Sequence, residues 1–209
     1  AAEPAATDES HEDSAFPTRT LFGLGGLAAA GVVAGLAGRR SLQQRRRRSG
    51  ERTPVASAPA VATERQLRAV ADADGVVVID RSLRHLARAC AAAGTPLPDL
   101  HALRLTEGHL VVRLAGGATM PAPWTGVPGG TDWSIGREAA LALDPEAVDG
   151  VPAPYPALVT LGQDDDGHLL IDLEQAGSLG FLGEQHAVRS ALAALTLELA
   201  TSAWADDLQ

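Results

Sequence analysis

The residue types in this 209-residue chain that can support chemistry are few and scattered. Asp164, Asp165 and Asp166, followed by Gly167, supply the oxygen ligands that calcium prefers. A calcium loop alternates its ligands, whereas three adjacent aspartates point in different directions, so a hairpin turn is the favoured interpretation. The single cysteine, Cys90, and the six separated histidines show no zinc-site spacing. We therefore predict no metal site.

Residues 176–180, AGSLG, approach the nucleophile elbow, in which a serine stands on the turn between a strand and a helix. The elbow requires the helix to begin at the serine, but the apolar residues LGFL follow Ser178. His186 is the only histidine after Ser178, and it lies at the start of a predicted helix. The sequence therefore predicts no catalytic residues, and we expect the chain not to be an enzyme.

The segment from Leu169 to Ala200 has the order apolar strand, glycine turn and long helix. In this order it resembles the nucleotide-binding segment of FtsK/SpoIIIE-type ATPases. That segment requires GxxxxGK[ST], in which the Lys holds phosphates. Here Gly183 is followed by Glu184, which would repel phosphate, and the chain contains no lysine. We predict no cofactor, and keep an FtsK-like secretion component with a degenerate, non-hydrolysing nucleotide site as the alternative function.

An uncharged stretch of 19 residues, 20–38, is followed directly by arginines. At 1.5 Å per helical residue this stretch can cross the ~30 Å hydrocarbon layer of a membrane. Positive charge marks the cytoplasmic end of such a span, so we predict a single-pass protein in the cell membrane, with its N-terminus outside and its C-terminus in the cytoplasm. Six arginines are predicted to contact the anionic inner leaflet of the bilayer: Arg39, Arg40, Arg45, Arg46, Arg47 and Arg48.

Small residues share one face of this predicted span. Ala28, Gly31, Gly35 and Gly38 follow one another at helical spacing, and Gly31 with Gly35 forms a GxxxG pair. Such a face allows two helix backbones to approach closely, so it is a candidate face for a homodimer. The alternative is that glycine is simply common in this chain.

Charge is distributed unevenly along the chain. Residues 1–19 carry five acids and one arginine and are predicted to be a disordered, extracytoplasmic tail. Residues 39–52 carry seven arginines, whereas the remainder carries nine arginines and twenty acids. An acidic domain does not attract nucleic-acid phosphates, so we do not expect direct nucleic-acid binding. Arginine without lysine is typical of a GC-rich genome. The first residue is Ala1 rather than Met, so we expect a processed form or a part of a longer protein.

The predicted fold class is α+β, with β-hairpins packed against two or three helices. We expect an Arg-rich juxtamembrane linker at 39–62 and a cytoplasmic domain at 63–209, either one unit or two halves at 63–150 and 151–209. Alternating residues predict two hairpins and a further strand: strands at 101–106 and 109–114, one around Trp133, and strands at 157–161 and 168–173. Residues 179–182 form a further short apolar run.

Apolar residues at helical spacing predict the helices of this domain. We expect a short helix around Leu67 that ends near Gly75, and a second helix capped by Asp80 and closed by Gly94. A long helix is expected over 184–203, with four residues on its apolar face: Val188, Leu192, Leu195 and Leu199. Three arginines form a stripe on the second helix, either a solvated face or a docking face for an acidic partner: Arg81, Arg84 and Arg88.

Three stretches together cover most of 76–208: RSLRHLARACAAAGTPLPDLHALRL, APWTG with GGTDWSI, and PALVTLGQDDDGHLLIDLEQAGSLGFLG through ELATSAWADDL. They resemble a family of large actinobacterial membrane proteins. That family combines a LysM-containing region, a membrane span, an Arg-rich stretch, such an α+β segment and a bacterial transcriptional activator domain. The resemblance implies a membrane-anchored regulatory or scaffold protein. Its expected partners are the lipid bilayer and either another protein or other domains of the same polypeptide.

Overall fold

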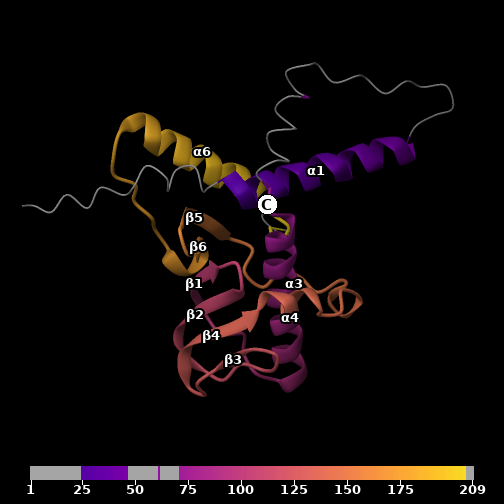
Figure 1. Ribbon diagram of the computed structural model, residues 1–209, viewed down its shortest axis with the longest axis vertical. Coiled ribbons are helices and arrows are strands. Elements are labelled where there is room, and N and C mark those ends of the chain that lie inside the picture. The colour runs from indigo at the N-terminus through magenta and orange to yellow at the C-terminus, as the bar shows by residue number, and fades with distance from the viewer. Residues whose placement is uncertain (1–24, 47–60, 62–70, 206–209) are drawn as a thin grey trace, which may run out of the picture.

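The computed structural model describes residues 25–46, 61 and 71–205. The predicted acidic tail at 1–19, most of the predicted linker at 39–62 and the helix predicted around Leu67 lie outside these residues. The described part is α+β, as predicted, and it contains one six-stranded antiparallel sheet together with its helices (Figure 1).

Two hairpins supply four of the six strands of the sheet, and both were predicted from alternating sequence. Strands β1 (Leu100–Leu105) and β2 (His109–Ala118) pair around the Glu107-Gly108 turn. Strands β5 (Leu158–Asp164) and β6 (Gly167–Asp172) pair around the aspartate turn. Alternation places one set of side chains on the core face of each strand, which is why the pattern could be recognised without the structure.

The two hairpins share one sheet because β1 also pairs with β6. A further strand, β4 (Gly130–Gly136), contains Trp133 as expected and pairs with β2. The two-residue strand β3 (Thr125–Gly126) completes the order β3-β4-β2-β1-β6-β5. The apolar run at 179–182 is not a strand but part of a loop.

Helix α3 (Ala73–Ala93) begins earlier than predicted. Asp72, not Asp80, is its N-cap, because the Asp72 carboxylate accepts a hydrogen bond from the Gly75 N–H at 2.8 Å. Gly75 therefore lies in the first turn of the helix rather than ending a separate short helix. The end of α3 is as predicted, since Gly94 adopts a φ of 64° and terminates it.

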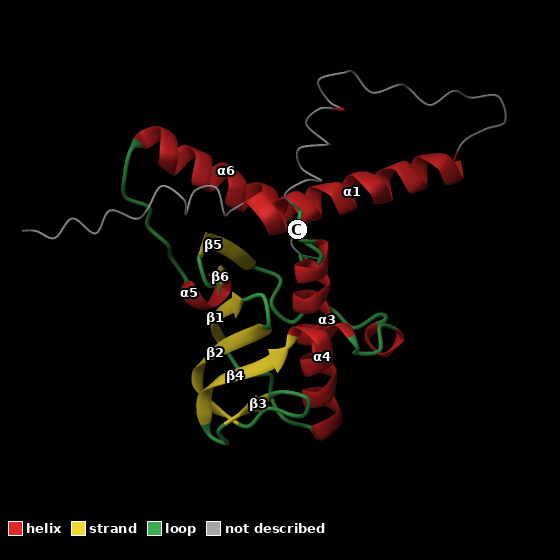
Figure 2. Cartoon of the chain, in the orientation of Figure 1, coloured by secondary structure: helices red, strands yellow, loops and turns green. Residues whose placement is uncertain are grey.

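Helix α3 packs lengthwise against one face of the sheet (Figure 2). The short helix α4 (Arg137–Leu141) and the 3-10 turn η2 (Glu146–Val148) pack against α3. Ile79 and Leu83 of α3 are buried in the same cluster as Leu103 of β1. The opposite face of the sheet carries ion pairs between exposed side chains, among them Arg113 with Asp132 at 2.8 Å. The core therefore lies between α3 and the sheet.

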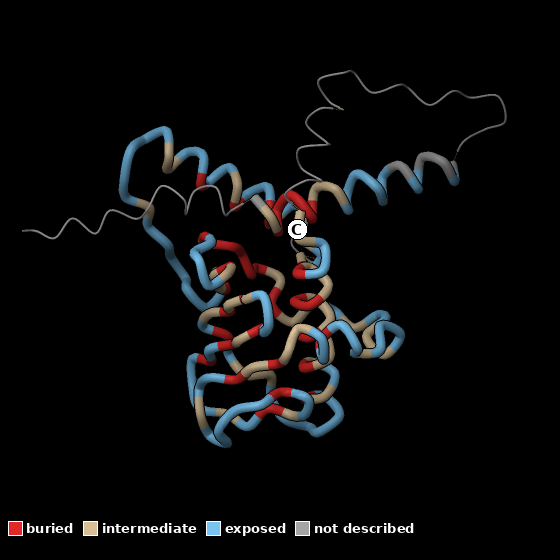
Figure 3. Tube along the Cα trace, in the orientation of Figure 1, coloured by how far each residue is buried: buried red, intermediate tan, exposed pale blue. Residues whose placement is uncertain are grey.

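Helix α1 (Gly25–Arg46) changes environment along its length. Residues 27–31 are buried, whereas residues 34–39 are exposed (Figure 3). The buried residues contact α6 (Gln185–Thr201) and α3, and the Gly26 carbonyl accepts a hydrogen bond from the Asp72 N–H. Among the described residues, no helix combines the length and the apolarity needed to cross a bilayer.

Helix α6 confirms the long helix predicted over 184–203, but its buried face is rotated from the expected one. Its buried residues are Ala191, Leu195 and Glu198, so only Leu195 belongs to the predicted apolar face. The reason is that α6 lies against the edge of the sheet at β5, where a polar side chain meets strand backbone. Leu192, by contrast, is 47% exposed.

Candidate functional site

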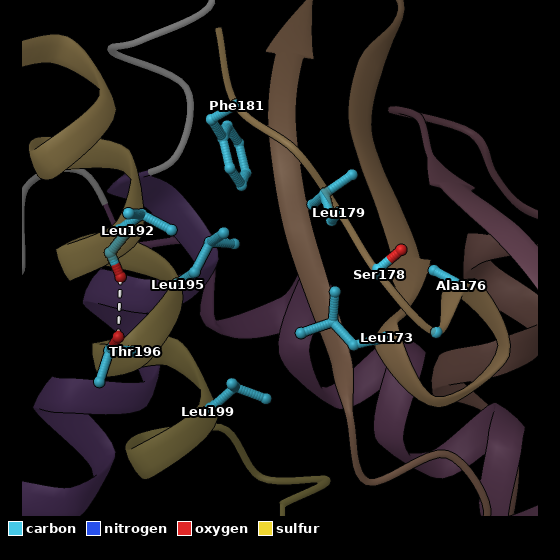
Figure 4. A pocket seen from close by; sticks show the side chains of 10 residues that line it. Leu173, Ala176, Ser178, Leu179, Phe181, Leu192, Leu195, Thr196 and Leu199 are labelled. Atoms are coloured by element: carbon cyan, nitrogen blue, oxygen red, sulfur yellow. Dashed lines mark hydrogen bonds between the residues drawn. The ribbon is translucent and has the colours of Figure 1, made fainter. Parts of the chain in front are cut away.

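An apolar groove, which we name the α6 groove, lies between α6 and the segment that follows β6 (Figure 4). Its volume is about 310 Å³. One wall comes from the short helix α5 (Leu173–Ala176) and the loop after it, and the other comes from α6. The lining residues are Leu173, Ala176, Gly177, Ser178, Leu179, Phe181, Leu192, Leu195, Thr196 and Leu199.

The first wall is positioned by the end of β6. Asp172 is buried there, and its carboxylate caps α5 by accepting a hydrogen bond from the Glu174 N–H at 3.1 Å. Burial raises the pKa of this carboxyl above its usual range. Gly177, at a φ of 66°, then turns the chain so that the following loop runs beside α6.

The second wall is fixed because side chains of α6 and of the residues after it bind the edge of β5. The buried Glu198 carboxylate accepts hydrogen bonds from the Thr160 N–H at 3.0 Å and the Thr160 hydroxyl at 2.7 Å. The Trp204 indole donates to the Leu158 carbonyl at 2.8 Å. These contacts satisfy strand groups that would otherwise lie unpaired at a sheet edge.

Glu198 and Trp204 are structural determinants that the sequence analysis missed. Burial raises the pKa of Glu198, and the hydrogen bonds from Thr160 act in the opposite direction. The one sequence signal was a single glutamate inside the apolar run LTLELA. A glutamate on a helix is normally expected to face solvent. Its buried partner here, Thr160, lies in a strand 38 positions earlier and could not be recognised from the sequence.

Large apolar side chains remain exposed around the groove. Leu192 is 47% exposed and Leu179 is 40% exposed, and Leu182 of the same loop is fully exposed. Three residues of the predicted apolar face of α6 line this groove: Leu192, Leu195 and Leu199. Contiguous exposed apolar residues beside a hollow are typical of an interaction site.

The three arginines of the predicted stripe on α3 donate hydrogen bonds to backbone carbonyls of the same chain. Arg81 donates to the Leu141 and Leu143 carbonyls, at 2.7 and 3.2 Å. Arg84 donates to the Val151 carbonyl and, at 3.1 Å, to the Ala203 carbonyl. Arg88 donates to the Ala147 carbonyl at 3.0 Å. The three arginines therefore hold the segment around the end of α4 and the residues directly after α6 against α3.

The small-residue face predicted on 20–38 is divided in the structure. Ala28 is buried, and a Cβ added to Gly31 would lie 2.8 Å from the Thr201 carbonyl oxygen of α6. Gly35 and Gly38 have nothing within 4 Å of such a Cβ. Close backbone approach thus occurs at Gly31 with a helix of the same chain, and dimerisation through this face stays a prediction.

The aspartate cluster is a hairpin turn. The Asp164 carboxylate accepts hydrogen bonds from the Asp166 and Gly167 N–H groups, at 3.0 and 3.1 Å. It also pairs with Arg104 at 2.7 Å, and this hydrogen bond lowers the pKa of Asp164. Within the described ranges, no three His, Cys, Asp or Glu side chains are grouped in a way that would hold a metal ion.

Another hollow, of about 620 Å³, lies between the loop at 95–99 and the residues at 116–121. Five of its twelve lining residues are glycine or proline, and Asp99 is the one ionisable side chain that it exposes, because Cys90 is buried. This hollow lacks the cluster of exposed large apolar residues found at the α6 groove. The α6 groove is therefore the stronger candidate site.

Neither the serine-nucleophile interpretation nor the nucleotide-site alternative gains support from the geometry. No residue that lines the α6 groove is a histidine or a carboxylate, so the groove offers Ser178 no general base. Gly183 is followed by Glu184 as the N-cap of α6, where a carboxylate would oppose a phosphate. Comparison with protein-family models, curated proteins and solved structures gave no match, so the resemblance to membrane-bound regulators stays a prediction.

Proposed function

We propose that this chain is a non-enzymatic regulatory or scaffold module whose α+β unit binds an apolar protein segment in the α6 groove. The observation that carries the proposal is the groove itself, an open apolar channel between one helix and one loop. The helical wall is held rigidly by Glu198 and Trp204, so the channel exists before anything binds. The segment can come from a partner protein or from elsewhere in the same polypeptide.

The chemistry of the groove favours a segment with spaced apolar side chains and a basic flank. Apolar surface supplies affinity when it leaves water, at roughly 25 cal/mol per Å². The exposed Glu174 and Glu184 stand on either side of the loop at 177–183, so a basic residue next to the apolar ones would be attracted. The part of the chain from residue 53 onward is acidic, with nine arginines and twenty acids, which adds to this attraction.

We also infer that α1 attaches the module to the anionic inner face of a membrane. A 22-residue helix is about 33 Å long. The start of α1 packs on the body of the molecule, and the arginines of its second half stand at the far end (Figure 1). An acidic body is repelled by an anionic surface, so a basic tip held away from it is the part that would make contact.

The experiment that tests groove binding is a selection of nonapeptides on the full chain, followed by affinity measurement on matched variants. Leu192 and Leu197 are both 47% exposed on α6, but only Leu192 lines the groove. We expect selected peptides to carry two or three spaced apolar residues and an arginine or lysine. Leu192→Asp should weaken their binding at least tenfold, and Leu197→Asp should leave it within twofold.

Equal effects of the two substitutions would place binding elsewhere on the molecule and would contradict the proposal. Circular dichroism of both variants confirms that the comparison concerns folded protein. Because both leucines are exposed, neither aspartate introduces a buried charge, and the fold should tolerate both changes.

A further inference from the structure

The loop wall of the α6 groove contains a straight stretch of chain, residues 179–182, which we name the LGFL stretch. It lies between Gly177 and Gly183, whose φ values are 66° and 148°, and it contains neither a turn nor a bend. Among the described residues, no hydrogen bond joins its N–H or C=O groups to another backbone group. An extended stretch with unpaired backbone groups is a template to which another strand can add.

The side chains of the LGFL stretch alternate as they do in a β-strand. Leu179 and Phe181 line the groove, whereas Gly180 and the fully exposed Leu182 do not. Figure 4 shows the stretch beside α6, with Phe181 and Leu195 facing the space between them. The stretch is therefore laid out like a single strand that lacks a neighbour, and the groove lies on one of its two faces.

The groove has room for the alternate side chains of an added strand. An apolar cavity of roughly 150 Å³ accommodates one benzene molecule. The groove, at about 310 Å³, therefore accommodates about two apolar side chains. From Leu192 to Leu199, α6 rises about 10 Å, and the LGFL stretch spans about 13 Å. Because neighbouring side chains on one face of a strand are about 7 Å apart, both walls can contact two of them.

The charges at the two ends of the LGFL stretch favour a basic partner over a second copy of the chain. Glu174 and Glu184 are exposed on either side of the stretch, and no basic side chain lines the groove. Two copies that paired through this stretch in antiparallel fashion would bring Glu174 of one chain near Glu184 of the other. Like charges placed opposite each other oppose association, whereas an arginine or lysine at the end of a partner strand would be attracted.

We propose that the α6 groove binds an extended segment of a partner protein, which pairs with the LGFL stretch as an added β-strand. The inference rests on the proposed function, and it defines the conformation and the residue pattern of the ligand. Backbone hydrogen bonds to the stretch hold the segment, and alternate apolar side chains enter the groove against Leu192 and Leu199. An arginine or lysine at its end faces Glu174 or Glu184. A helical ligand, by contrast, satisfies its own backbone and leaves the stretch unpaired.

Two synthetic nonapeptides of identical composition test the residue pattern. In Arg-Thr-Leu-Thr-Phe-Thr-Leu-Thr-Arg the apolar residues alternate with threonine, as on one face of a strand. In Arg-Leu-Thr-Thr-Phe-Thr-Thr-Leu-Arg they are three apart, as on one face of a helix. Calorimetric titration of the full chain should show at least tenfold tighter binding of the alternating peptide. Leu192→Asp should weaken that binding at least tenfold, and Leu197→Asp should leave it within twofold.

Amide hydrogen exchange on the full chain, followed by NMR, tests the backbone pairing itself. Successive residues of a strand direct their N–H groups to opposite edges, so a strand added at one edge covers every second amide. With the alternating peptide bound, exchange should slow at least tenfold either at Leu179 and Phe181 or at Gly180 and Leu182. The other two amides should change less than twofold. Equal slowing at all four amides, or no slowing at any, would overturn the inference.

Equal affinities of the two peptides, or no binding of either, would also overturn the inference. Slow exchange of these amides before peptide is added would do the same: a dependence on chain concentration would identify a second copy as the occupant, and independence would identify a segment of the same chain. The proposed function fails by a different result, namely that no nonapeptide is selected or that the selected ones are insensitive to Leu192→Asp.

Discussion

At the scale of single residues, the most informative position is Glu198, a carboxylate that is 1% exposed. It replaces the missing neighbour strand at β5, because its oxygens accept both hydrogen-bond donors of Thr160. A buried charge is costly unless it is paired or hydrogen-bonded, so the two contacts determine the orientation of α6. That orientation in turn presents Leu192 and Leu199 to the groove.

Glu198 gives the folding stability a specific dependence on pH. Burial raises its pKa in the folded protein, so the folded state holds the proton over a range in which the unfolded state has lost it. The contribution of Glu198 is therefore fully present below the pKa of an ordinary glutamate and is lost as pH rises through the raised value. Within that window the free energy of unfolding should fall by up to about 1.4 kcal/mol per pH unit.

The measurement is urea denaturation of the wild type and of Glu198→Gln between pH 4 and pH 8. Gln keeps the shape and an acceptor for the Thr160 N–H but cannot ionise. The difference in stability should shift in favour of Glu198→Gln as pH rises. The raised pKa of the buried Asp172 is common to both proteins and cancels in this difference. If the difference in stability between the two proteins does not change with pH, Glu198 does not have a raised pKa in the folded protein.

Removal of the acceptor has a different consequence from removal of the charge. Glu198→Ala leaves the Thr160 N–H and hydroxyl without this partner, and we expect a loss of about 2–4 kcal/mol in the free energy of unfolding. Thr160→Val, which removes only the hydroxyl donor, should cost about 1 kcal/mol. Denaturation at pH 5 checks both values, and equal losses would show that the backbone contact contributes nothing.

At the scale of elements, α1 approaches the backbone of α6 closely at one small residue, Gly31. Gly31→Ala would place a methyl group 2.8 Å from the Thr201 carbonyl oxygen, so α1 and α6 must move apart. Gly35→Ala meets nothing within 4 Å and removes a helix-weakening glycine. We expect Gly31→Ala to lower the thermal midpoint and Gly35→Ala to stabilise by about 0.5–1 kcal/mol. Thermal denaturation by circular dichroism makes the comparison, and equal shifts would contradict the packing of α1 on α6.

The far half of α1 leads to a prediction about membranes. The full chain should float with vesicles that contain phosphatidylserine and not with vesicles of phosphatidylcholine alone, because each arginine near an anionic surface contributes about 1 kcal/mol. Changing Arg45–Arg48 to glutamine should release it. High salt should also release it, since surface charges are screened. Retention through salt and alkaline washes would instead support the membrane span predicted from residues 20–38.

The elements differ in how far they could be predicted from the sequence. Both hairpins were predictable because alternation and turn residues such as Glu107-Gly108 act over a few neighbouring positions. The start of α3 was not predictable, because a glycine such as Gly75 usually marks the end of a helix. Here Gly75 lies in the first turn, and its N–H donates to the Asp72 carboxylate. The α6 groove also could not be predicted, since it forms where Leu173 and Leu199 are brought together by the pairing of α6 with β5.

At the scale of the whole molecule, the sheet has two different edges. The edge at β3 is only two residues long, which limits pairing with another chain. The edge at β5 is longer and is covered by α6 and by the indole of Trp204, which is 1% exposed. The C-terminal helix therefore shapes the groove on one side and covers a sheet edge on the other.

Removal of this cover should cause self-association through β5. Trp204→Ala removes the donor to the Leu158 carbonyl and opens the space beside a strand whose residues 158–160 are buried. We expect dimers or larger species that increase with concentration in sedimentation velocity. Adding Thr160→Pro, which removes the edge N–H that Glu198 binds in the unchanged protein and which cannot pair as a strand, should restore a single species. Association that persists in the double variant would show that a surface other than the β5 edge is responsible.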